Sequence, residues 1–211
     1  MDGAFGGFSV AIVRSGEVLA HRRVDGSVAL EDGLPLLLET MRQAALAPAE
    51  VDLLAVGTGP GGFTGLRIAI SYAKALALGW RRPLAGVNTF DAMTHGIEPS
   101  PGLAVISSKP GTASVRLSLP GEYKRFSGTS ASVCDEIAAS WPGGEMSVVG
   151  APEDVRDGLG ERGISMRIVA MQQPPAVAIA QIAARAPHAT SPHAIRADYG
   201  ESPPAKVPQA R

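Results

Sequence analysis

The sequence is poor in cysteine and in charged side chains. Its 211 residues include a single cysteine, Cys134, which excludes an intramolecular disulfide framework and a zinc site built from cysteines. Charged residues make up 18% of the chain, and 19 basic against 20 acidic side chains leave a formal net charge of −1. Because counterion release needs a concentrated positive field, we expect no strong binding of nucleic acid by this chain alone.

Long apolar runs are also missing. The sequence has no stretch of about 18 consecutive apolar residues and no charged-then-apolar leader after Met1, so we expect neither a membrane span nor a signal peptide. These absences predict a cytoplasmic protein that does not bind membranes. Hydrophobic residues nevertheless make up 45%, which is enough to build a core, and the length predicts one domain or two small lobes.

Strands and helices alternate through the first half of the chain. The expected elements are a hairpin of residues 8–13 and 18–24, a helix over 30–46, a strand over 51–57, a helix over 66–79, a strand over 83–87 and a helix from 89 to 95. This alternation is typical of an α/β layer fold whose sheet is at least partly parallel. Before the hairpin, residues 2–7 have the composition of a glycine-rich turn. We favour the interpretation that most of a first strand is lacking there, over a domain that begins with a turn.

The pattern weakens after Ile97. Residues 98–102 are typical of a linker. Beyond them we expect strands over 103–107, 114–119, 123–126 and 147–149, and helices over 133–140 and 177–186. The proline-rich stretch 188–211 has no apolar period, which predicts an extended or disordered tail.

The most informative segment is 57–74, where a glycine-rich loop joins a strand to a helix. As a phosphate-binding loop it is incomplete, because Phe63 and Thr64 stand where the Walker pattern requires lysine and then serine or threonine. A second interpretation is a tight turn that packs the helix closely on the strand, with Phe63 in the core. A third concerns Ala69, Ala73 and Ala77, which recur every four residues and form a flat stripe that another helix could approach, in this chain's own core or in a partner.

The segment Gly59-Pro60-Gly61-Gly62-Phe63-Thr64-Gly65-Leu66-Arg67-Ile68 closely resembles the hallmark of the bacterial TsaB (YeaZ) family, whose usual form is Gly-Pro-Gly-Ser-Phe-Thr-Gly-Leu-Arg. The resemblance is strong over residues 50–93, weaker over 1–49 and faint beyond 97. It makes the loop a candidate site, with the residues Gly59, Pro60, Gly61, Phe63, Thr64, Gly65 and Arg67.

The resemblance implies an actin-like, sugar-kinase-like (ASKHA) α/β fold in two lobes. Residues 1–96 would form the first lobe, with a truncated first strand, and 97–211 a smaller, diverged second lobe. Family members are non-catalytic partners of TsaD in making threonylcarbamoyladenosine, next to the anticodon of tRNAs that read codons beginning with adenine. The implied helical interface has two parts. They are Leu34, Leu38 and Met41 on one helix and Ala69, Ala73 and Ala77 on the other.

The resemblance also implies where the other components of the reaction lie. A TsaE-like ATPase would join the heterodimer with a TsaD-like protein, and a homodimer stays open. We assign no cofactor to this chain and expect ATP and metal on the partner subunits. Contact with tRNA is expected only through the complex.

Two departures from the family pattern, and the lack of the metal-binding histidine pair of TsaD, bear on catalysis. Only Asp2 remains of the usual Asp-Thr-Ser strand end, and Ser107-Ser108-Lys109 stands where the second lobe often has Asp-Ala-Arg. His188 and His193 are five residues apart, which is not a helical ligand spacing. Since Mg²⁺–phosphate sites depend on carboxylates, we expect no ATP hydrolysis by this chain alone and no metal site. A glycoprotease-like or ATP-dependent enzyme of the same fold is the alternative.

Overall fold

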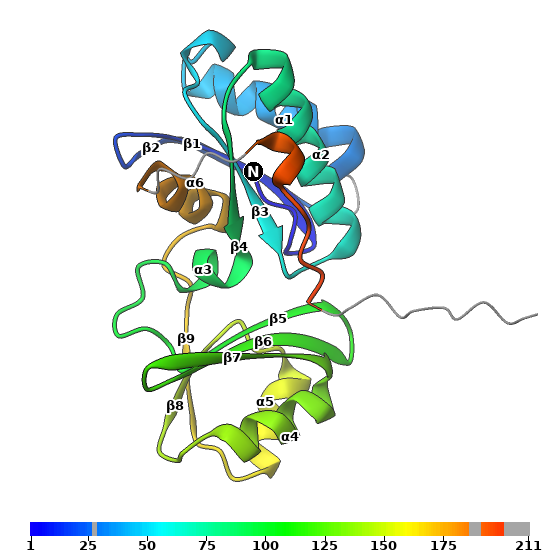
Figure 1. Ribbon diagram of the computed structural model, residues 1–211, viewed down its shortest axis with the longest axis vertical. Coiled ribbons are helices and arrows are strands. Elements are labelled where there is room, and N and C mark those ends of the chain that lie inside the picture. The colour runs from blue at the N-terminus through cyan, green and yellow to red at the C-terminus, as the bar shows by residue number, and fades with distance from the viewer. Residues whose placement is uncertain (27–28, 186–190, 201–211) are drawn as a thin grey trace, which may run out of the picture.

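The computed structural model describes residues 1–26, 29–185 and 191–200 of this chain. The described chain forms two lobes stacked along the long axis of the molecule (Figure 1). Each lobe has its own β-strands, and helices cover these strands. The α/β fold in two lobes predicted from the sequence is therefore confirmed.

The first lobe contains two pairs of strands. β1 (Gly7–Arg14) and β2 (Glu17–Asp25) form an antiparallel hairpin, and β3 (Leu54–Gly59) pairs in parallel with β4 (Leu84–Asn88). The other elements of this lobe are α1 (Ala29–Gln43), η1 (Pro48–Glu50), α2 (Phe63–Trp80), α3 (Thr89–Thr94), α6 (Pro175–Arg185) and η2 (Pro192–Ala194).

Successive side chains on the strands of the first lobe point to opposite faces, so the strands lie between two apolar layers. Val10, Leu54 and Val56 point toward α1 and α2, where Leu37 and Met41 complete a buried cluster. The opposite faces of β3 and β4 pack against α6 through a second cluster: Ala85, Val87, Ala178, Ile179 and Ala183. The strands are thus covered on both sides, as their nearly continuous apolar sequence requires.

The second lobe is one five-stranded sheet in the order β7-β6-β5-β8-β9. Its elements are β5 (Leu103–Lys109), β6 (Thr112–Leu119), β7 (Glu122–Thr129), α4 (Ser130–Ser140), β8 (Met146–Val149), α5 (Glu153–Glu161) and β9 (Met166–Val169). The helices α4 and α5 cover one face of this sheet. The other face meets the first lobe through Ala104, Ile106 and Val149, which pack with Leu66 and Phe90.

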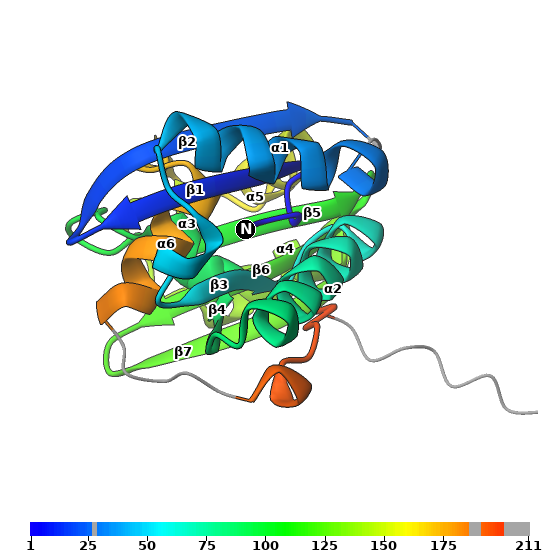
Figure 2. The ribbon, with the colours of Figure 1, turned by 90° about the horizontal axis from the view of Figure 1, so that it is seen from above.

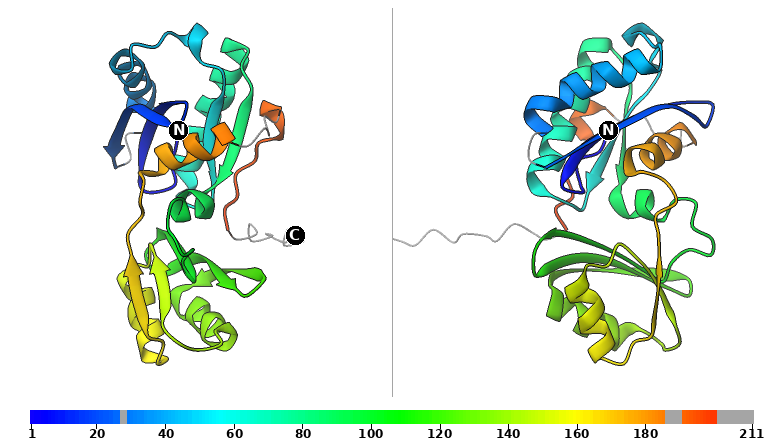
Figure 3. Two further views of the ribbon diagram at one scale, coloured as in Figure 1. Left: turned by 90° about the vertical axis from the view of Figure 1, so that its left-hand side faces the viewer. Right: turned by 180° about the vertical axis from the view of Figure 1, so that it is seen from behind.

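The chain returns to the first lobe at its carboxyl end, which corrects the predicted lobe boundary. α6 packs beside β1 and β3 in the first lobe, so residues 97–211 are not all in the second lobe (Figure 3). Within residues 191–200, predicted as part of an extended or disordered tail, Pro192–Ala194 form η2, Ile195 is buried, and the Asp198 N–H bonds to Thr58 of β3. The rest of the predicted tail, 188–190 and 201–211, lies outside the described residues.

The small-residue stripe of α2 faces inward. Ala69, Ala73 and Ala77 are buried in the cluster between α2 and the strands of the first lobe, so the prediction that they face a partner is wrong. Their small size serves this chain's own core, because it lets α2 lie close to β3. In the described part of the chain, no helix has the length and apolar character needed to cross a bilayer.

This burial gives a matched pair of substitutions on one helix. Ala73→Glu would place an unpaired charge in the core and is expected to lower the melting temperature by about 10 °C or more. Ala75→Glu changes an exposed position two residues away and is expected to shift it by less than about 2 °C. Thermal melts followed by circular dichroism measure both, and equal melting temperatures for the two variants would contradict the inward orientation of the stripe.

Candidate functional site

The glycine loop closes against the amino end of the chain. β3 ends at Gly59, and Gly62 is the residue before the first turn of α2. The Gly62 N–H donates to the carbonyl oxygen of Ala4 at 2.9 Å. The loop amide that precedes α2 is therefore already bonded within the chain, which weighs against the phosphate-binding interpretation.

Two glycines, Gly3 and Gly65, allow the amino-terminal segment to contact the backbone of α2 directly. A Cβ on Gly65 would lie 2.1 Å from the carbonyl oxygen of Gly3, and a Cβ on Gly3 would lie 2.2 Å from that of Gly65. Gly61 is equally restricted, because its Cβ would lie 2.5 Å from the Cβ of Ala4. Gly61 and Gly65 of the hallmark segment are therefore needed for close packing, as the second interpretation predicted.

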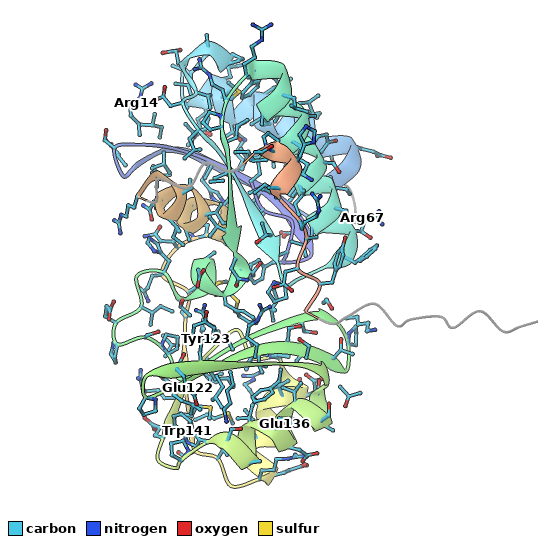
Figure 4. All side chains as sticks on the ribbon, in the orientation of Figure 1. Arg14, Arg67, Glu122, Tyr123, Glu136 and Trp141 are labelled. Carbon is cyan, nitrogen blue, oxygen red and sulfur yellow. The ribbon has the colours of Figure 1, made fainter. Side chains whose placement is uncertain are left out.

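The other motif side chains point outward. Phe63 is 54% exposed instead of filling the core as the tight-turn interpretation expected. Its ring centroid lies 4.8 Å from that of Tyr199, and the Arg67 guanidinium lies 5.0 Å from its centre. Thr64 is also exposed, and Arg67 projects from α2 into solvent (Figure 4). A phenylalanine on the first turn of a helix gave no sequence signal for this orientation, because its partner, Tyr199, comes from a distant segment.

The carboxyl-terminal segment 195–200 crosses from the first lobe to the second. Its Asp198 N–H donates to the Thr58 carbonyl oxygen at 2.7 Å, while the Asp198 carboxylate pairs with Arg125 on β7. A Cβ on Gly59 would lie 2.0 Å from the Asp198 carbonyl oxygen, so the segment lies directly on the glycine loop. Figure 3 shows it running from the first lobe toward the second-lobe sheet.

A second contact between the lobes centres on Arg116 of β6. Its guanidinium donates to the Phe90 carbonyl oxygen at 3.2 Å and to Thr94 Oγ1 at 3.0 Å, and it pairs with Asp91. All three partners lie on α3 of the first lobe. Together with the Arg125–Asp198 pair, this contact fixes one lobe on the other.

Asp2 is buried beneath the loop. Burial raises the pKa of its carboxyl to about 6, and the nearby amino-terminal ammonium and backbone N–H groups oppose that shift. Its Oδ2 accepts from the Ala4 N–H at 3.3 Å, whereas Oδ1 has no hydrogen-bond partner. A Cβ on Gly57 would lie 2.7 Å from that oxygen, so only glycine leaves room for it.

The surroundings of Asp2 do not fit a nucleotide with its metal. The end of β5 presents Ser107 and Lys109, so the second lobe supplies no carboxylate at the position of the missing Asp-Ala-Arg. Within residues 1–26, 29–185 and 191–200, no group of three or more His, Cys, Asp or Glu side chains could hold a metal ion. His193 lies in the exposed η2 segment, and His188 lies outside the described residues.

Large apolar side chains are exposed on both α1 and α2. Leu34 and Leu38, one turn apart on α1, are 43% and 50% exposed, and Leu78 on α2 is 56% exposed. We call these three side chains the leucine face. Met41 is buried instead, since it lies one turn from Leu37 on the inner side of α1. Sequence reasoning missed Leu78, because both sides of α2 are apolar and spacing alone does not indicate which side is exposed.

The close contact between Gly3 and Gly65 can be tested with two glycines of α2. Gly65→Ala forces a Cβ against the Gly3 carbonyl oxygen and is expected to lower the free energy of unfolding by about 2–3 kcal/mol. Gly79→Ala has open space and is expected to raise it by about 0.5–1 kcal/mol through helix propensity. Urea denaturation measures both values, and a neutral Gly65→Ala would contradict the packing role.

Comparisons with known proteins agree with the fold and the motif. The family described as "TsaD: tRNA N6-adenosine threonylcarbamoyltransferase" matches residues 30–155, more than half of the chain. The tRNA threonylcarbamoyladenosine biosynthesis protein TsaB of Escherichia coli (strain K12) is 32% identical over 161 residues, which are 74% of this chain and 63% of that protein. The tRNA N6-adenosine threonylcarbamoyltransferase of Gluconobacter oxydans (strain 621H) is 34% identical over 132 residues, 54% of this chain and 36% of that protein. The chain thus spans less than two thirds of these relatives.

Solved structures support the same fold. YeaZ from Pseudomonas aeruginosa superposes with a TM-score of 0.68 at 22% identity, covering 94% of this chain and 96% of that one. A second structure from that organism, described as similar to peptidase YEAZ, gives a TM-score of 0.70 at 22% identity, with 95% and 97% coverage. The family match, the TsaB relative and the hallmark loop agree: this chain belongs to the TsaB (YeaZ) branch of the TsaD family.

Proposed function

We propose that this chain is a non-catalytic partner of a TsaD-like protein in the formation of threonylcarbamoyladenosine on tRNA. The observation that carries the proposal is the leucine face, three large apolar side chains exposed on two neighbouring helices. A folded protein gains nothing from exposing such side chains together, and exposed apolar patches mark interaction sites. The TsaB relative, named for the biosynthesis of this nucleoside, supports the choice of pathway.

Close packing of α1 and α2 holds the leucine face in a fixed position. α1 lies closely on α2, because a Cβ on Gly33 would come within 2.6 Å of the Tyr72 ring. Leu37 and Met41 anchor the inner side of α1, and Ala73 anchors the inner side of α2. A partner helix can therefore dock on Leu34, Leu38 and Leu78 without unfolding either helix, so little conformational entropy is lost on binding.

A non-catalytic role accords with the surroundings of the glycine loop. The Gly62 N–H is bonded to Ala4, and the segment around Asp198 lies on the loop. We assign ATP and metal to the partner subunits, where a TsaD-like protein and a TsaE-like ATPase would hold them. With a net charge of −1, this chain would reach tRNA only as part of that assembly.

One substitution on the leucine face tests the proposal. Leu38→Asp places a charge on the leucine face and is expected to weaken binding to the cognate TsaD-like protein at least tenfold, about 1.4 kcal/mol. Isothermal titration calorimetry measures the dissociation constant. The melting temperature of the variant should stay within about 2 °C of the parent, because Leu38 is half exposed.

Ile168→Asp is the matched control, since Ile168 is a similarly exposed aliphatic residue on β9 of the other lobe. It should bind like the parent. Unchanged affinity for Leu38→Asp would contradict the proposed interface. Loss of self-association by Leu38→Asp, with no binding to the TsaD-like protein in either form, would assign the leucine face to a homodimer instead.

A further inference from the structure

The linkers between the two lobes lie side by side. The chain enters the second lobe through residues 95–102, after α3, and returns through residues 170–174, before α6. Residues 96–99 and Gln172 line one small cavity, and a Cβ on Gly96 would lie 3.6 Å from the Cβ of Gln172. Adjacent linkers of this kind can act as a hinge, because a few residues at the ends of elements absorb the change in backbone angles.

The segment 195–200 crosses between the lobes on the opposite side. In Figure 1 both linkers lie to the left of the lobe interface and this segment lies to the right, and Figure 2 shows it beside α2, away from α6. Ile195 anchors the segment in the first lobe, where it is buried against Gly86. Gly200 reaches the second lobe, since a Cβ on it would lie 2.2 Å from Ser114 Oγ on β6. The segment therefore spans the interface at the end away from the linkers.

Asp198 bonds to both lobes. Its backbone N–H donates to the Thr58 carbonyl oxygen of the first lobe at 2.7 Å, and its carboxylate pairs with Arg125 of the second lobe. The side chains of Asp198 and Arg125 are 32% and 41% exposed. Ion pairs with this exposure contribute little to stability and are weakened by salt. The pair can therefore break while each lobe keeps its own core.

Arg116 holds the lobes together between the linkers and this segment. Along β6, the Ser118 N–H donates to the Gly102 carbonyl oxygen of the first linker at 2.8 Å, whereas Ser114 lies against Gly200. Arg116 stands between these two positions and bonds to three residues of α3. Its side chain is 14% exposed, so this contact is better protected from solvent than the Asp198 ion pair. The Arg116 contact can therefore serve as a pivot while the far end of the interface opens.

The two interface arginines repel each other unless both are neutralised. Arg116 and Arg125 lie directly opposite on β6 and β7, and like charges at such positions are destabilising. Asp91 pairs with the first and Asp198 with the second. Among the ion pairs of the described residues, Asp198 supplies the carboxylate for Arg125, so its removal would leave an uncompensated cation beside Arg116. The charge of Asp198 thus decides whether this end of the interface is held closed.

We propose that residues 195–200 form a latch, closed by the Asp198–Arg125 ion pair, and that release of this pair lets the second lobe turn about the two linkers. In the open form the segment stays on the first lobe, where Tyr199 lies on Phe63 of α2. Opening moves β7 away from the glycine loop. The leucine face belongs wholly to the first lobe and stays unchanged, so this inference does not depend on the proposed function.

Double electron–electron resonance between two spin labels measures the opening. The labels are attached at Ala75→Cys on α2 and Glu136→Cys on α4, both exposed, in a chain whose buried cysteine is replaced by Cys134→Ala. Asp198→Lys places a third cation beside the two interface arginines. It is expected to broaden the distance distribution and to shift its mean outward by about 5 Å or more, because the lobes separate at the latch end.

Asp157→Lys is the matched control, since it makes the same change of charge at an exposed position of α5. It should leave the distance distribution of the labelled parent unchanged. Combining Asp198→Lys with Arg125→Glu exchanges the charges of the pair and should restore the short distance. An unchanged distribution in Asp198→Lys would overturn the latch, and so would an equal shift in the control. A distance that stays long in the combined variant would overturn the role of the ion pair.

Discussion

The hydrogen bonds of Met1 and Asp2 hold the first lobe together. These two residues pair with Ser9 on one side and with Ala55 and Gly57 on the other, so they connect strand pairs that otherwise belong to separate sheets. Their position sets the path of the next residues, which brings Gly3 and Ala4 against the glycine loop. The loop glycines follow from that constraint, since any Cβ on Gly61 or Gly65 would strike the backbone or side chain of this short segment.

The same constraint shapes the functional proposal. The loop that opens α2 is closed by Ala4 from below and by the segment around Asp198 from above, and no carboxylate stands at the end of β5. The surface that we propose for the partner is instead a pair of helices held from within by Leu37, Met41 and Ala73. Their outer leucines, Leu34, Leu38 and Leu78, are exposed. A fixed fold with an apolar helical surface is what a scaffold subunit requires.

The sequence predicted the elements with strong patterns and missed those without them. The hairpin, α1, β3, α2 and β4 were predicted within a few residues, because apolar spacing and turn residues agree there. α5 was missed since Gly158 and Gly160 weaken its helical pattern, and β9 has only four residues. The inward direction of Ala73 and the outward direction of Phe63 depend on what packs beside them. Spacing within one helix does not contain that information, and the return of α6 to the first lobe depends on contacts far apart in sequence.

The central claim is that this chain supports the formation of threonylcarbamoyladenosine through a partner. The most direct measurement is mass spectrometry of nucleosides from total tRNA after depletion of the protein in its host. The account predicts that threonylcarbamoyladenosine falls and that re-expression of the parent chain restores it, whereas re-expression of Leu38→Asp does not. An unchanged level after depletion, or full restoration by Leu38→Asp, would contradict the account.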